Sequence, residues 1–88
     1  NLAHLATWIA REPKLSWIKP VSGTTALVKL GLEMTSNDFC VALLQEQGVM
    51  FTPGSALGME GYVRIGYANN PEILTAGLER VSDFLSRH

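Results

Sequence analysis

The chain contains one cysteine, almost no net charge and no long apolar run, and each of these shortages excludes a class of protein. Cys40 is the single cysteine, so the chain has no internal disulfide and no multi-cysteine metal site. A lone thiol also favours a reducing, cytoplasmic setting. Lysine and arginine number 7 against 8 acidic residues, and this balance gives no electrostatic basis for binding nucleic acid. No apolar run approaches the roughly 20 residues that span a bilayer, so we expect no membrane partner.

The length is that of one small domain. A chain of 88 residues buries a smaller share of its surface than a typical domain, and its independent stability is expected to be modest. The sequence begins at Asn1 rather than at a methionine, and we expect it to be part of a longer protein. We take residues 1–88 as a single domain.

Hydrophobic periodicity and turn residues predict an alternation of helices and strands. The expected elements are a helix over 1–11, strands over 15–19 and 26–32, a helix from a Thr35 or Ser36 cap to Gly48, strands over 49–52 and 62–68, and a helix beginning with Asn70 and Pro71. Two prolines are expected to end strands, Pro20 the first and Pro53 the third. The order predicts an α+β fold of two layers, in which a largely antiparallel sheet of about four strands is covered by helices.

An arginine stands at the centre of the strand expected over residues 62–68. A buried, unpaired guanidinium is strongly unfavourable, so Arg64 calls for an anionic partner, and its planar fork of donors matches a carboxylate. Side chains alternate between the two faces of a strand. One face carries Tyr62, Arg64, Gly66 and Ala68, and the other carries the apolar set Val63, Ile65 and Tyr67 that suits contact with helices.

Two interpretations of Arg64 remain open on the residues alone. In the first, Arg64 binds a ligand that approaches closely beside Gly66, which has no side chain. In the second, Arg64 is structural, and it pairs with Glu60 or another acid or extends its charged end to water.

Four segments resemble, in order and at matching separations, the class I/II (fold-type I) aminotransferases that depend on pyridoxal 5'-phosphate (PLP). The segments are KPVSGTTA at 19–26, NDFCVALLQEQGV at 37–49, PGSALGMEGYVRIGY at 53–67 and EILTAGLERVSDFL at 72–85. The resemblance covers most of the chain. It implies that the chain is the C-terminal small domain of such an enzyme, without the large domain that binds PLP.

The resemblance also implies roles for residues of the third segment. Arg64 matches the arginine that holds the α-carboxylate of the substrate. Pro53, Gly54 and Gly58 match a loop at the rim of the substrate pocket. Proline fixes one backbone dihedral and glycine permits a positive one, so we expect Pro53 and Gly54 to make a tight turn.

Two further residues of this loop are candidates for contact with substrate. Ser55 either supports the loop or contacts the substrate, and the alternative is an ordinary turn whose serine bonds to neighbouring backbone. Leu57 stands where many relatives have an aromatic residue, which leaves the side-chain preference of the pocket open.

For the whole enzyme, the resemblance implies transfer of an amino group between an amino acid and a 2-oxo acid. PLP would be held mainly by the large domain of the same chain, which also carries the Schiff-base lysine. We therefore expect no catalytic residue and no metal ligand in this segment, and no activity of the segment alone. The resemblance further implies a homodimer and closure of the small domain over the active site. Two alternatives are a PLP-dependent lyase or synthase of the same fold, and a non-catalytic aminotransferase-like module that senses an effector.

Overall fold

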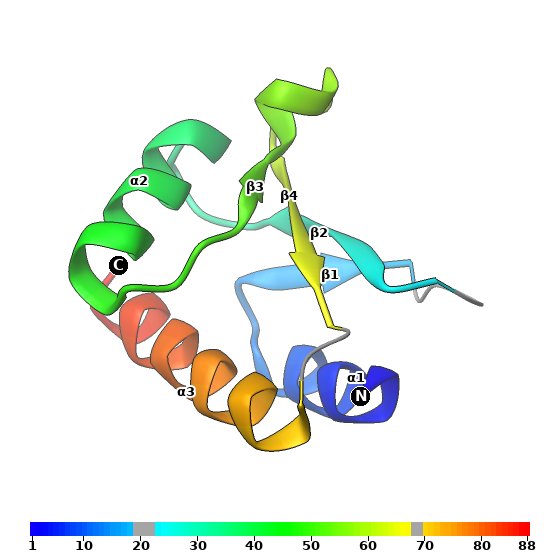
Figure 1. The fold of residues 1–88 in the computed structure, drawn as a ribbon. Coiled ribbons are helices and arrows are strands. Elements are labelled where there is room, and N and C mark those ends of the chain that lie inside the picture. Colours follow the sequence, from blue (N-terminus) through cyan, green and yellow to red (C-terminus); the bar gives the residue numbers. More distant parts are fainter. Residues whose placement is uncertain (19–22, 68–69) are drawn as a thin grey trace.

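The computed structural model describes residues 1–18, 23–67 and 70–88, and these residues form helices packed on one side of a sheet (Figure 1). The elements are α1 (Leu2–Arg11), β1 (Leu15–Trp17), β2 (Thr25–Leu30), α2 (Ser36–Gln47), β3 (Thr52–Pro53), the 3-10 helix η1 (Gly54–Leu57), β4 (Tyr62–Gly66) and α3 (Pro71–Arg87). The predicted α+β fold and the predicted order of helices and strands are confirmed. None of the described helices is long and apolar enough to cross a membrane.

The sheet is antiparallel throughout and has the strand order β1-β2-β4-β3. β2 and β4 therefore form its centre, and the two short strands form its edges. In the register of β4, Arg64 lies opposite Leu27 of β2 on one side and opposite Thr52 of β3 on the other. Arg64 consequently sits on a strand whose backbone is held from both sides.

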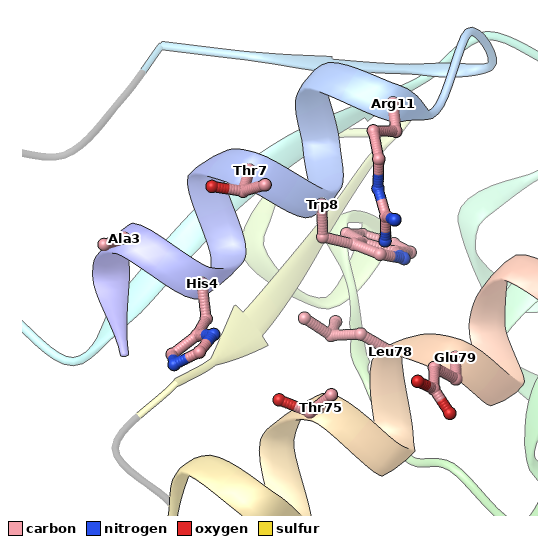
Figure 2. A pocket seen from close by; sticks show the side chains of 8 residues that line it. All are labelled: Ala3, His4, Thr7, Trp8, Arg11, Thr75, Leu78 and Glu79. Atoms are coloured by element: carbon pink, nitrogen blue, oxygen red, sulfur yellow. The ribbon is translucent and has the colours of Figure 1, made fainter.

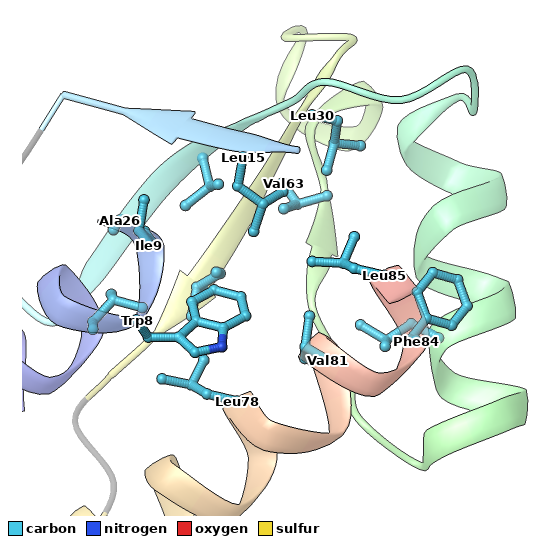
Figure 3. Packing of buried hydrophobic residues seen from close by; sticks show 14 of the residues in the cluster. Trp8, Ile9, Leu15, Ala26, Leu30, Val63, Leu78, Val81, Phe84 and Leu85 are labelled. Atoms are coloured by element: carbon cyan, nitrogen blue, oxygen red, sulfur yellow. The ribbon is translucent and has the colours of Figure 1, made fainter. Parts of the chain in front are cut away.

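The hydrophobic core lies between the sheet and the helices (Figure 3). Alternate residues of β2 and β4 point into it, as the period of two predicts. Burial of apolar surface, at about 25 cal/mol per Å², is the main source of stability of such a domain. The strands contribute Leu15, Ala26, Val28, Leu30, Val63 and Ile65, and α3 contributes Leu74, Leu78, Val81, Phe84 and Leu85.

Hydrogen bonds fasten the first helix to the last. The indole Nε1 of Trp8 donates to Ser82 Oγ at 2.6 Å, and Ser82 Oγ donates to Glu12 Oε2 at 2.6 Å. Lys14 Nζ donates to the carbonyl oxygen of Leu85 at 2.7 Å. Because these partners stand near opposite ends of the sequence, the contacts close the helical layer.

Capping residues set the helix boundaries where the sequence predicts them. Thr35 Oγ1 accepts a hydrogen bond from Asp38 N at 3.1 Å, so Thr35 is the N-cap of α2. α2 ends at Gly48, which has a φ of 68°, a left-handed conformation that glycine adopts without steric cost. α3 begins with Asn70 as N-cap and Pro71 in the first turn.

The third strand differs from the prediction. We expected residues 49–52, ending before Pro53, and the structure pairs only Thr52 and Pro53 with β4. Val49 and Phe51 pack against the core while Met50 is 77% exposed, so the side chains of this segment alternate although its backbone is not paired in the sheet. Pro53 fits an edge strand because its missing N–H takes nothing from the interior of the sheet.

The other strands are shorter than predicted. β2 ends at Leu30 rather than at residue 32, and the N–H of Gly31 instead donates to the carbonyl oxygen of Lys14 at 2.6 Å. β1 ends at Trp17, and β4 ends at Gly66. The expectations for Lys19, Pro20 and Ala68 lie outside the described residues.

Candidate functional site

Arg64 lies on the outer face of the sheet, away from the helices. Its neighbours in β4, Val63 and Ile65, are each 1% exposed and point into the core, whereas Arg64 is exposed. Arg64 Nη2 donates to Thr52 Oγ1 of the adjacent strand at 3.4 Å. The main chain of Arg64 is thus fixed within the sheet while its guanidinium is accessible.

The described part of the chain leaves the charge of Arg64 without an acidic partner. Ion pairs within it join Arg87 to Asp83 and His88 to Glu46, and neither includes Arg64. Glu60 was the acid expected if Arg64 were structural, and its carboxylate is bound elsewhere. The alternative that pairs Arg64 with Glu60 is therefore wrong.

Glu60 binds the first turn of α2 and so ties the loop of residues 54–61 to that helix. Glu60 Oε2 accepts from Ser36 N at 2.8 Å and from Gly61 N at 2.6 Å. Ser36 Oγ donates to Glu60 Oε1 at 3.2 Å and accepts from Ser55 N at 3.0 Å. Ser36 is fully buried, so its hydroxyl forms a closed junction between helix and loop.

The same contacts set the ionisation of Glu60. The N–H of Ser36, followed by that of Gly61, lowers the pKa of the Glu60 carboxyl, because hydrogen bonds donated to a carboxylate favour its charged form. Its position at the start of α2 acts in the same direction, since the N-terminus of a helix carries partial positive charge. The junction therefore contains a carboxylate anion.

Gly54 serves the loop in a different way from the one predicted. We expected a positive φ at Gly54, and among the described residues the positive φ values fall on Gly23, Gly48, Gly58 and Gly61 instead. A Cβ atom at Gly54 would overlap the carbonyl oxygens of Met59 and Tyr62. Gly54 thus allows a close backbone approach, and the left-handed conformation belongs to Gly58, with a φ of 72°.

The other candidates of this loop are exposed. Ser55 anchors the loop through its backbone N–H, and within the described residues its hydroxyl makes no hydrogen bond. Leu57 is 41% exposed. Pro53 lies opposite Val63, directly before Arg64, so the loop starts beside the arginine. No hydrogen bond within the described chain joins Ser55 to Arg64.

Two surface grooves lie away from the Arg64 side chain. One, of about 330 Å³, runs between α1 and α3, where His4 and Arg11 face Thr75 and Glu79 (Figure 2). The other, of about 470 Å³, lies between residues 48–51 and α3 and has Gly66 in its wall. Arg64 lines neither groove, so a ligand bound to it would need a second surface to enclose it.

The lysines of the described chain do not fit a PLP site. Lys14 Nζ is engaged with the carbonyl oxygen of Leu85. Lys29 is exposed on the outer face of β2, without the apolar enclosure that activates a lysine nucleophile. No cluster of metal-binding side chains is present among the described residues. A carboxylate anion, in contrast, fits the accessible guanidinium of Arg64.

The junction of Ser36 and Glu60 does not follow from the sequence patterns. Those patterns indicate Ser36 as a helix cap and Glu60 as a partner for Arg64. Thr35 already meets the capping requirement, which leaves the neighbouring hydroxyl free for a contact 24 residues further along the chain. The available signal for this contact was that two residues able to cap a helix, Thr35 and Ser36, stand side by side at the start of α2.

Known proteins resemble the chain in both sequence and fold, although no protein-family model matches it. Nicotianamine aminotransferase A of Hordeum vulgare is 43% identical over 75 residues, which make up 80% of this chain and 16% of that protein. S-alkyl-thiohydroximate lyase of Arabidopsis thaliana is 40% identical over 75 residues, with the same shares of 80% and 16%. The crystal structure of a PLP-dependent aminotransferase from Streptococcus suis matches with a TM-score of 0.96 and 47% identity, covering 99% of this chain and 23% of that chain.

The chain spans 16% of the length of these two curated relatives. The match in structure extends over 99% of the chain at 47% identity, so the family is supported by fold and by sequence together. The chain belongs to the fold-type I, PLP-dependent aminotransferase family.

Proposed function

We propose that the chain is the C-terminal small domain of a PLP-dependent aminotransferase and that Arg64 binds the α-carboxylate of its substrate. The observation that carries the proposal is the state of Arg64, an accessible guanidinium on a central strand with no acidic partner in the described chain. A sheet position held from both sides fixes the main chain of Arg64 before a ligand arrives. Such preorganisation reduces the entropy lost on binding.

The space beside Arg64 suits a small carboxylate ligand. A Cβ atom at Gly66, on the same face two residues further along, would meet no other atom within 4 Å. The five N–H donors of the guanidinium form a planar fork that matches two carboxylate oxygens, and such charge-assisted pairs are stronger than neutral hydrogen bonds. Arg64 would therefore fix the position and the rotation of the substrate together.

The whole enzyme would transfer an amino group between an amino acid and a 2-oxo acid. PLP, when bound by the large domain of the same chain, supplies an electron sink for bonds at the α-carbon. The part of this segment is to hold the carboxylate and, by closing over the site, to exclude water. We also propose that the whole protein is a homodimer. We further propose that it is cytoplasmic, because a lone, buried thiol suits a reducing compartment.

A PLP-dependent lyase is the second candidate. The Arabidopsis relative is a lyase and is 40% identical to the chain, close to the 43% of the barley aminotransferase. Lyases of this fold would need the same carboxylate contact, so Arg64 does not distinguish the two reactions.

An assay of the full-length parent protein loaded with PLP separates these functions. Single amino acids are added first without an acceptor and then with a second 2-oxo acid, and the products are analysed at each stage. Release of a 2-oxo acid, followed by amino transfer to a second 2-oxo acid, is the result expected for an aminotransferase. Release of ammonia or a thiol in place of amino transfer would establish a lyase. A parent protein that does not bind PLP would contradict both.

A further inference from the structure

We propose that Ser36 and Glu60 are positioning residues, which fix the loop of residues 54–61 and so set the shape of the substrate pocket. This inference rests on the proposed function, because it concerns the loop beside Arg64. The hydroxyl of Ser36 is the centre of the arrangement, since it donates to Glu60 and accepts from Ser55 N. One fully buried atom thus joins a helix to both ends of the loop.

Capping of α2 does not account for these contacts. Thr35 already caps α2 by accepting from Asp38 N. The Ser36 hydroxyl makes its hydrogen bonds to the loop alone, at Glu60 and at Ser55 N. Ser36 and Glu60 therefore serve the loop in addition to the helix.

The loop closes on itself without help from α2, so the junction determines where the loop lies rather than its internal shape. Met59 N donates to Gly54 O at 2.7 Å, and Tyr62 N donates to Met59 O at 3.2 Å. The first bond lies within the loop, and the second joins the loop to β4. Leu30 N of β2 also donates to Gly61 O at 2.8 Å, so the strands hold the end of the loop. The hydrogen bonds that join the loop to α2 among the described residues are those of Ser36 with Ser55 and Glu60.

Placement of the loop acts on two parts of the proposed site. It determines where the exposed side chains of Ser55 and Leu57 stand. It also holds the N–H of Gly61, the residue directly before the strand that carries Arg64. A loose junction would weaken substrate binding without removing any group that contacts the substrate.

The test uses the full-length parent protein with PLP bound and compares Ser36→Ala, Glu60→Ala, Glu60→Gln and Thr35→Ala. Ser36→Ala removes the shared hydroxyl, and Glu60→Ala removes its partner at an exposed position that leaves the core intact. Glu60→Gln is the conservative variant, because its amide oxygen can accept from both N–H groups and its amide nitrogen can donate to Ser36 Oγ. Thr35→Ala weakens the same helix terminus but leaves the junction in place.

Two readouts are taken from each variant. Hydrogen exchange by mass spectrometry follows the amides of residues 54–61, and steady-state kinetics with the preferred amino acid give KM and kcat. For Ser36→Ala and Glu60→Ala we expect faster exchange of the loop and a rise in KM of roughly tenfold, as for loss of about one hydrogen bond, with kcat changed far less. Glu60→Gln should stay within about threefold of the wild type in KM, and Thr35→Ala should leave KM and loop exchange unchanged.

The possible outcomes separate this inference from the proposed function. Wild-type exchange and KM in Ser36→Ala and Glu60→Ala, with activity lost in Arg64→Ala, would overturn the positioning role alone. An equal rise of KM in Thr35→Ala would also overturn it, because the effect would then follow helix stability. Unchanged kinetics in Arg64→Ala would contradict the proposed function, and the exchange data would still decide whether the junction holds the loop.

Discussion

Thr52 and Arg64 face each other across β3 and β4, and Arg64 Nη2 lies 3.4 Å from Thr52 Oγ1. A hydrogen bond of this length is weak, because typical N–H···O distances are about 2.7–3.2 Å. Thr52 is uncharged, so it directs the guanidinium without neutralising it. The positive charge of Arg64 remains available to an anionic ligand.

Replacement of Arg64 in the parent enzyme should reduce kcat/KM for amino acid substrates strongly. Each hydrogen bond to a charged group is worth about 1.5–3 kcal/mol, so loss of a two-pronged contact in Arg64→Ala should lower kcat/KM roughly 10²–10⁴-fold. Arg64→Lys keeps the charge but not the fork of donors, and it should recover only part of the loss. Steady-state kinetics with one amino acid over a range of concentrations measure both effects.

Arg87→Ala is the matched control for loss of positive charge. Arg87 lies near the end of α3, in the helical layer, and pairs with Asp83 at 2.8 Å on the surface. Exposed pairs of this kind are worth about 0.2–1 kcal/mol, so kcat/KM should not change. Equal losses in Arg87→Ala and Arg64→Ala would show a general effect of charge and would remove the assignment of Arg64.

Gly54→Ala should destabilise the chain. The added Cβ atom would overlap the carbonyl oxygens of Met59 and Tyr62, so the backbone of the loop must shift. We expect the free energy of unfolding to fall by about 2–4 kcal/mol. Urea denaturation followed by the fluorescence of Trp8 and Trp17 measures the change.

Gly77→Ala should have the opposite effect on the stability of the chain. Gly77 lies inside α3, and a Cβ atom there would meet no other atom within 4 Å. Alanine is favoured over glycine in a helix interior by about 0.8–1.0 kcal/mol, so this substitution should stabilise the chain. If both alanine variants had the same stability, the steric role of Gly54 would be refuted.

The contribution of Glu60 to stability should depend on pH in the acid range. The folded state lowers the pKa of Glu60, chiefly through the N–H of Ser36. The contribution of Glu60 to stability is complete when the pH is above the ordinary pKa of a glutamate, about 4.3. This contribution is lost as the pH falls through the lowered pKa that Glu60 has in the folded state. Ser36, Ser55 and Gly61 carry no titrating group, so the dependence belongs to Glu60 itself.

Comparison with Glu60→Gln isolates this dependence. The wild type should be more stable than Glu60→Gln at about pH 6, and the difference should shrink towards about pH 3. Glu79→Gln is the control, since Glu79 is exposed on α3 and makes no hydrogen bond within the described residues. A difference between wild type and Glu60→Gln that stays constant between these pH values would contradict the prediction.

Cys40 should be inert towards thiol reagents while the chain is folded. The side chain is 8% exposed, and burial raises its pKa to about 11. At about pH 8 the reactive thiolate would then be roughly one part in a thousand. Labelling with a chromogenic disulfide reagent should be slow in buffer and fast in denaturant. Rapid labelling of the native chain would show that Cys40 is accessible.

Local sequence signals were sufficient to predict where the helices begin and end. Thr35, Gly48 and Asn70 mark helix ends by the chemistry of their own side chains or backbone, and each stands where it was predicted. The inward and outward faces of β4 also followed from sequence, because alternation is a local property.

Contacts between distant residues could not be predicted in the same way. The segment before Pro53 alternates like a strand, and Val49 and Phe51 pack on the core, but only Thr52 and Pro53 pair with β4. The bond between Ser36 and Glu60 joins residues 24 apart, and no local pattern announces it. At the site, the sequence therefore predicted the positions of single side chains better than the hydrogen bonds that hold the loop beside them.

The edges of the sheet limit how copies of this chain can associate. β1 has 3 residues and β3 has 2, and Pro53 lies within β3. A free strand edge offers a row of unpaired N–H and C=O groups to another chain, and short edge strands or proline reduce that row. Each edge strand therefore presents little backbone for strand addition, which protects a small domain with an accessible sheet face from edge-to-edge aggregation.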